Sequence, residues 1–128
     1  MALLRDIVFD CTHPASLARF WAAALTGYEV APYDEAELTR LRAEGIEDPE
    51  DDPLVLVEPT APGAPRLFCQ RVPEPKVTKN RVHLDLWAEG LASERDRLVG
   101  LGAVLVREEP DLLVLADPEG NEFCLLAD

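Results

Sequence analysis

Basic residues, cysteines and histidines are all scarce in this 128-residue sequence. Only 12 Lys and Arg stand against 25 Asp and Glu, so the formal net charge is -13. Nucleic-acid binding that does not depend on base sequence needs basic groups to displace phosphate counterions, and the composition argues against it. An acidic surface that keeps the protein in solution explains the charge, and attraction of a cationic ligand is the alternative.

The cysteines and the apolar runs exclude further classes of protein. Cys11, Cys69 and Cys124 form no CxxC pair, and an odd number is a poor disulfide framework, so a reducing cytoplasm is expected. The start, MALLRDIVFDC, has only a short apolar run before Asp6, which is too little for a signal-peptide core or a membrane span. We expect a cytoplasmic domain that begins at Met1 and binds no membrane.

Periodic apolar residues divide the first half of the chain into strands and helices. Residues 3–11 predict a strand, and THPASLARFWAAALTG predicts a helix with Pro14 in its first turn and Gly27 at its exit. A buried stripe at helical spacing consists of Leu17, Phe20, Trp21, Ala24 and Leu25, which makes Trp21 a core residue. Asp34 and Glu37 predict the capping box of a second helical piece, and residues 47–53 predict a solvated acidic loop.

An internal repeat relates the two halves. The short strand YEVAPY and the strands LVLVEP and RLFCQRV complete the first half, and the second half contains the strand RVHLDLW, a helix ending at Gly102 and three more strands. The pairs Asp10 and Asp85, and Gly27 and Gly102, share one offset, and LFCQ matches EFCL, which sets Cys69 opposite Cys124. We predict an α+β fold of two βαβββ modules, residues 1–73 and 81–128, joined by a linker at 74–80 within one domain, 1–128.

A polar stripe follows one face of the strand at residues 81–87. His83, Asp85 and Trp87 alternate with Val82, Leu84 and Leu86, which we expect to pack under the helix. Each module has one amphipathic helix and leaves one sheet face uncovered, so two modules form a half-barrel around a shared cavity. The residues predicted to bind a ligand there are His83, Asp85, Trp87, Asp10 and Asp6.

The sequence resembles the vicinal oxygen chelate superfamily over nearly its whole length. The resemblance is carried by the paired βαβββ halves, the helix P-x-x-LARFW, the strand NRVHLDL and the closing DPEGNEFCL. This superfamily includes glyoxalases, extradiol dioxygenases, fosfomycin-modifying enzymes and bleomycin-binding resistance proteins, and the sequence is most similar to its small glyoxalase-like members. The resemblance implies a glyoxalase/bleomycin resistance-type fold.

The same resemblance bears on a metal site. In metal-using members, each half offers one ligand near the start of its first strand and another on its last strand, usually His and Glu or Gln. His83 and Cys124 match these positions in the second half, whereas the first half offers Asp6 or Val8, and Cys69 or Gln70. We therefore expect no metal. The alternative is a divalent metal such as zinc at His83, Cys124, Asp6 and Gln70, or Cys69 in place of Gln70.

Three functions follow from these expectations. The first is a metal-free protein that binds a small molecule and sequesters it, such as a cationic natural product. The second is a metal-dependent lyase, isomerase or dioxygenase of the glyoxalase or extradiol dioxygenase type. The third is a small oligomeric module whose cavity is filled by its own side chains. A homodimer is expected in each case, because an open sheet edge favours pairing.

Overall fold

The computed structural model describes all residues, 1–128, and the chain forms two compact units. Module 1 comprises Met1–Pro75 and module 2 comprises Lys76–Asp128. The division falls within the segment expected to link the modules. None of the helices combines the length and the apolar character that crossing a membrane requires.

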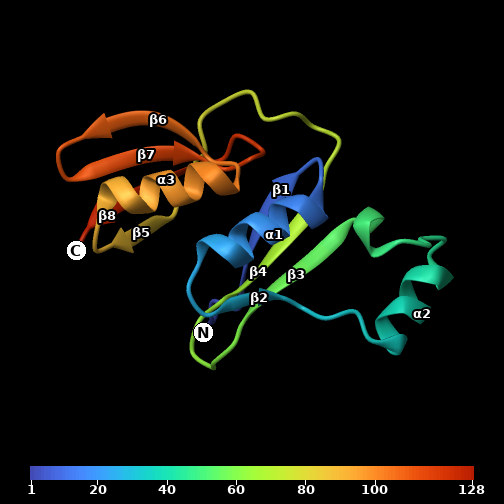
Figure 1. Ribbon diagram of the computed structural model, residues 1–128. Coiled ribbons are helices and arrows are strands. Elements are labelled where there is room, and N and C mark those ends of the chain that lie inside the picture. Colours follow the sequence, from blue (N-terminus) through green and yellow to red (C-terminus); the bar gives the residue numbers. More distant parts are fainter. The chain divides into compact units, whose positions relative to one another are not determined.

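Module 1 is a four-stranded mixed sheet with one helix packed on it. Its elements are β1 (Asp6–Cys11), α1 (Pro14–Ala24), β2 (Tyr28–Val30), α2 (Glu35–Ala43), a 3₁₀ turn (Pro49–Asp51), β3 (Leu54–Pro59) and β4 (Arg66–Arg71) (Figure 1). The strand order is β1-β4-β3-β2, in which β1 and β4 are parallel and the other neighbours are antiparallel. The first and last strands of the module therefore lie side by side.

Module 2 has the same topology without a second helix. Its elements are β5 (Asp85–Ala88), α3 (Leu91–Leu101), β6 (Val104–Glu109), β7 (Leu112–Ala116) and β8 (Glu122–Ala127) (Figure 1). The strand order β5-β8-β7-β6, with β5 parallel to β8, repeats the order of module 1 element by element. The predicted α+β fold of two βαβββ modules is confirmed.

The apolar stripe of α1 forms the core of module 1. Leu17 and Trp21 are at most 1% exposed, and the Trp21 ring stacks on Phe9 with ring centroids 5.1 Å apart. The strand residues that complete this core alternate along β3 and β4, as a half-buried sheet requires: Val55, Val57, Leu67 and Cys69. Trp21 is thus a core residue, as its helical spacing predicts.

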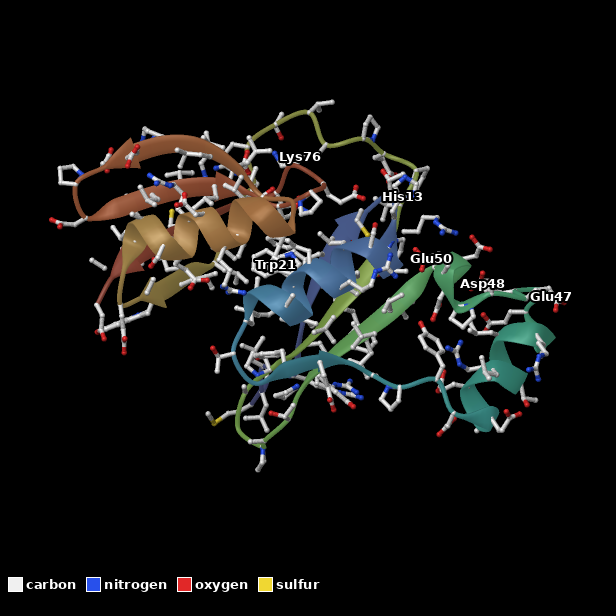
Figure 2. The ribbon with its side chains drawn as sticks, viewed as in Figure 1. His13, Trp21, Glu47, Asp48, Glu50 and Lys76 are labelled. Atoms are coloured by element: carbon white, nitrogen blue, oxygen red, sulfur yellow. The ribbon has the colours of Figure 1, made fainter.

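Residues 31–53 form an insertion that module 2 lacks. Asp34 caps α2 by accepting a hydrogen bond from the Glu37 backbone N–H at 2.9 Å, as the capping box predicts, whereas the Glu37 carboxylate binds Arg40 instead of the Asp34 N–H. The acidic segment that follows carries Glu47, Asp48 and Glu50 (Figure 2). Glu50 makes two hydrogen bonds to the guanidinium of Arg19 on α1, at 2.7 and 2.8 Å. The acidic loop is therefore fastened to the module, and Asp52 at its end is only 2% exposed.

The predicted strand at residues 81–87 starts later than expected. β5 begins at Asp85, while Arg81 and Val82 form a bend and Val82 is 78% exposed rather than packed under α3. The backbone N–H of Asn80 donates to the Glu122 carboxylate at 2.9 Å, so this segment is held by a side chain of β8 instead of a backbone ladder.

The expected match of Cys69 with Cys124 is wrong by one residue. Asp10 pairs with Gln70 in module 1, and Asp85 pairs with Cys124 in module 2, so Gln70 is the equivalent of Cys124. Cys69 is fully buried under α1, whereas the buried residues beside Cys124 are its neighbours Phe123 and Leu125. A shift of one residue moves every side chain of a strand to the opposite face. The wrong alignment arose because both strands contain the dipeptide Phe-Cys.

The two tryptophans should contribute very unequally to stability. We expect Trp21→Ala to lower the free energy of unfolding by about 3–5 kcal/mol, because it leaves a large cavity under α1. Trp87, which is 74% exposed, provides the matched control. Trp87→Ala should change the free energy of unfolding by less than about 0.5 kcal/mol. Urea unfolding followed by circular dichroism measures both values. Equal losses in the two variants would contradict the assignment of Trp21 to the core.

Candidate functional site

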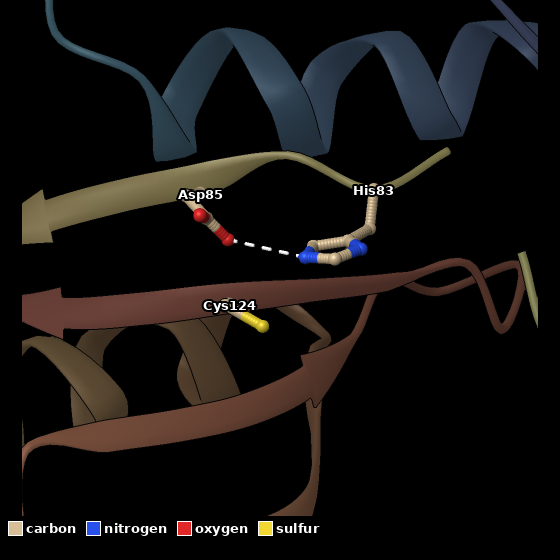
Figure 3. Close-up of side chains that lie close together, drawn as sticks. All are labelled: His83, Asp85 and Cys124. Carbon is tan, nitrogen blue, oxygen red and sulfur yellow. Dashed lines mark ion pairs between the residues drawn. The ribbon is translucent and has the colours of Figure 1, made fainter. Parts of the chain in front are cut away.

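Three side chains that can bind a ligand meet in module 2: His83, Asp85 and Cys124, called here the polar cluster. His83 precedes β5 by two residues, Asp85 is the first residue of β5, and Cys124 lies on β8. His83 Nε2 lies 3.2 Å from Asp85 Oδ1, and the cysteine sulfur lies beneath this pair (Figure 3). One ligand atom from each residue lies within 4.8 Å of the other two.

Strand pairing brings the cluster together. Asp85 and Cys124 are register partners on the parallel strands β5 and β8, and the Cys124 N–H donates to the Leu84 carbonyl at 2.9 Å. Phe123 and Leu125 are each 1% exposed on the face under α3. Because strand side chains alternate between faces, Cys124 and Asp85 lie on the face that α3 does not cover.

Burial and the Asp85 carboxylate both raise the pKa of the Cys124 thiol. Burial raises the pKa of Cys124, and the negative charge of Asp85 and a hydrogen bond with its side chain raise it further. The thiol is therefore held in its protonated form and donates to the carboxylate. The His83 and Asp85 side chains are 41% and 56% exposed, so both remain accessible to a ligand.

Glu122 fixes the segment that leads to His83. Its carboxylate accepts hydrogen bonds from the Asn80 backbone N–H and from Lys76 Nζ, each at 2.9 Å. Lys76 also donates to the Thr78 carbonyl. These contacts, led by the Asn80 N–H, lower the pKa of Glu122 to about 2. The approach to His83 is thus held against the first residue of β8.

The DPEGN motif has a structural role in the hairpin between β7 and β8. Asp117 is 1% exposed and accepts hydrogen bonds from the backbone N–H groups of Glu119 and Asn121, at 2.9 and 3.0 Å. The Asn121 side-chain amide donates to its second oxygen at 3.0 Å. The buried carboxylate closes the turn and sets where β8 begins.

Module 1 carries different side chains at the equivalent positions. Val8, Asp10 and Gln70 correspond to His83, Asp85 and Cys124, and all three are exposed. Asp6 is instead bound by the Arg66 guanidinium at 2.8 and 3.1 Å, and this hydrogen-bonded pair lowers the pKa of Asp6. Asp6 and Gln70 lie four register positions apart, about 13 Å along the strands, so they do not converge on one ion.

The predicted ligand-binding residues therefore fall into separate groups. His83 and Asp85 are together, and Trp87 follows on the same face of β5. Asp6 and Asp10 lie on β1, at the two ends of one strand face. Their role in binding stays a prediction. Asp85 is the donor that the expected metal set omitted, although its alternation with His83 along the chain already placed the two on one face.

Comparisons with known proteins agree on the fold. A family model described as a glyoxalase-like domain matches residues 6–126. An enzyme of the glyoxalase/bleomycin resistance protein/dioxygenase family from Burkholderia phytofirmans PsJN has a TM-score of 0.68 at 13% identity, with 98% of each chain covered. A glyoxalase-related enzyme from Fulvimarina pelagi has a TM-score of 0.64 at 15% identity, covering 100% of this chain and 89% of the other.

A third similar structure is the fosfomycin resistance protein FosX from Listeria monocytogenes. Its TM-score is 0.65 at 11% identity, with 100% of this chain and 92% of the other covered. No curated protein matches the sequence. At these identities the solved structures show a shared fold and no more.

The thiol of Cys124 should respond to Asp85. We expect Asp85→Asn to lower the pKa of the thiol, because it removes the negative charge that opposes a thiolate, and to speed alkylation by iodoacetamide at pH 8 several-fold. The alkylation rate should rise by less than the fraction of thiolate does, because a thiolate becomes a weaker nucleophile as the pKa of its thiol falls. Mass spectrometry locates the label, and Cys124→Ser is the control because Cys11 and Cys69 are buried. An unchanged rate would contradict the proposed coupling.

The low pKa of Glu122 predicts a pH-dependent contribution to stability. Its folded pKa of about 2 lies below the ordinary 4.5, so this contribution is full above pH 4.5 and is lost as the pH falls toward 2. Glu122→Gln should therefore lower the urea midpoint at pH 7, and its difference from the wild type should shrink on acidification. Glu89→Gln, at an exposed site in module 2, is the control. A difference that stays constant with pH would exclude this role.

Proposed function

The chain belongs to the glyoxalase-like domain family, and on this premise we propose that it binds a small organic molecule without a divalent metal. The bound molecule is sequestered rather than converted. The family match spans residues 6–126, so the proposal concerns both modules.

The observation that carries this proposal is the unequal set of donors in the two modules. Metal-using relatives take ligands from both halves, and here the positions equivalent to His83 and Cys124 hold Val8 and Gln70. Val8 offers no ligand atom, and Gln70 offers only a neutral amide oxygen, which is a weaker zinc ligand than an imidazole or a thiolate. Asp6, the other expected donor in module 1, is engaged by Arg66.

The polar cluster also suits an organic ligand. Its imidazole can donate or accept a hydrogen bond, and its carboxylate can accept one. Trp87, exposed on the same strand face, can stack on a flat or cationic molecule. The net charge of -13 favours a cationic one.

A second candidate, a zinc-dependent lyase or isomerase, is favoured by one observation. The donor atoms of His83, Asp85 and Cys124 lie within 4.8 Å of one another, and imidazole, carboxylate and thiolate are all ligands that zinc accepts. Three protein ligands leave a fourth position open for water or substrate. Zinc held by these residues would supply a Lewis acid that polarises a carbonyl group.

Elemental analysis of the purified protein distinguishes the two candidates. We expect far less than one zinc, iron, nickel or manganese per chain, also after incubation with zinc and gel filtration. About one metal per chain, lost in His83→Ala and retained in His13→Ala, would overturn the metal-free proposal. His13 is the matched control because it is the other histidine of the chain and lies at the start of α1.

A further inference from the structure

A pocket of about 460 Å³ lies within module 1, apart from every residue of the polar cluster. It lies between α2 and the face of the sheet that α1 leaves uncovered. Leu54 and Leu56 of β3 and Phe68 of β4 line it, and each alternates with residues buried under α1. Its volume is in the usual range of small-molecule sites.

The inserted segment at residues 31–53 supplies all the polar groups of this pocket. Tyr33, Asp34, Glu37, Arg40 and Asp52 line it, and each lies between the end of β2 and the start of β3. Module 2 connects the equivalent strands, β6 and β7, by a tight turn. The pocket is therefore a feature of the insertion and not of the repeated fold.

Asp52 is the unusual group in the pocket wall. It is 2% exposed and accepts one hydrogen bond from the Tyr33 hydroxyl at 2.8 Å and one from the Leu54 N–H at 3.0 Å. Burial and the bond to Asp52 raise the pKa of Tyr33, which keeps the phenol a donor. No Lys or Arg forms an ion pair with Asp52, although aspartates that are almost fully buried are usually paired.

The charge of the pocket favours a cation. Its walls carry the carboxylates of Asp34, Glu37 and Asp52 and a single guanidinium, that of Arg40. Arg40 is already engaged by Glu37 at 2.8 Å and Glu44 at 3.4 Å. Arg66, which does not line the pocket, lies over the Phe68 ring and is paired with Asp6.

We propose that this pocket binds a small organic cation, with its protonated amine beside Asp52 and its apolar body against Leu54, Leu56 and Phe68. The inference rests on the proposed binding of a small molecule, and it adds the class of the ligand and its place within module 1. The ligand supplies the ion pair that Asp52 lacks, because the Arg40 guanidinium interacts with Asp52 only at longer range and is paired with Glu37 and Glu44.

Three probes that share one ring test the proposal: naphthylmethylammonium, naphthylmethanol and naphthoate. In calorimetric titration the cation should bind most tightly, the alcohol less tightly and the anion least. The affinity of the cation should fall as salt is added. Asp52→Asn should lower the affinity for the cation at least about tenfold, because a charge-assisted hydrogen bond is lost. It should change the affinity for the alcohol by less than about twofold.

Asp51→Asn is the matched control, because it removes one charge from the adjacent, exposed residue outside the pocket. It should leave the affinity of the cation within about twofold. If Asp52→Asn does not fold, as judged by circular dichroism, Glu37→Gln carries the test, with a smaller loss for the cation only. Leu54→Ala should weaken the cation and the alcohol equally, since both bury the same ring.

Two outcomes would overturn the inference. One is no binding of the cation at millimolar concentration. The other is binding that Asp52→Asn and Glu37→Gln leave unchanged. If such binding is lost in Asp85→Asn or Trp87→Ala, the ligand occupies module 2, and the proposed function survives while the pocket assignment fails. The metal analysis tests the proposed function by itself.

Discussion

The parallel pairing of the first and last strands within each module is the constraint on which the rest of the structure depends. It joins β1 to β4 and β5 to β8, and with the helix covering one face it decides which side chains remain on the other. Asp85 meets Cys124 only through this pairing. Because strand side chains alternate, a shift of one register position would bury Cys124 under α3 and expose Phe123. The positions of Asp85 and Cys124 are therefore set by the same register as the core of module 2.

The two modules share a topology and differ in what they place on the uncovered face. Module 2 keeps an imidazole, a carboxylate and a thiol together, and its strands β6 and β7 are joined directly. Module 1 has no such set, and instead its long connection between β2 and β3 forms a second helix and a pocket. The connection is held to the module by the bond of Glu50 to Arg19 on α1, and the bond of Tyr33 to Asp52 joins the two ends of the connection to each other. The duplication has thus supplied two scaffolds whose chemistry differs.

The fold could be predicted because its signals are local. Apolar alternation, the helical stripe with Trp21 and the glycine exits each need only a few neighbouring residues, and repetition of the pattern identified the modules. The face shared by His83 and Asp85 followed from alternation for the same reason. Their meeting with Cys124 could not, since it depends on a strand register, and the match of Cys69 with Cys124 missed that register by one residue. The bond between Tyr33 and Asp52 could not be predicted from the sequence, because the acidic pattern of residues 47–53 is the same as that of a fully solvated loop.

The two buried carboxylates of the chain show why Asp52 is the one associated with a ligand. Asp117 is buried inside a turn whose own N–H groups bind both its oxygens, and it closes the hairpin that starts β8. Its negative charge is stabilised by the loop that surrounds it. Asp52 accepts from one phenol and one backbone amide, and at 2% exposure it is poorly solvated where it lines a pocket with both polar and apolar walls. A buried charge of that kind costs folding free energy, and a cation bound in the cavity recovers part of it. The coupling makes binding and the stability of module 1 interdependent, since a ligand that binds only the folded state shifts its unfolding equilibrium.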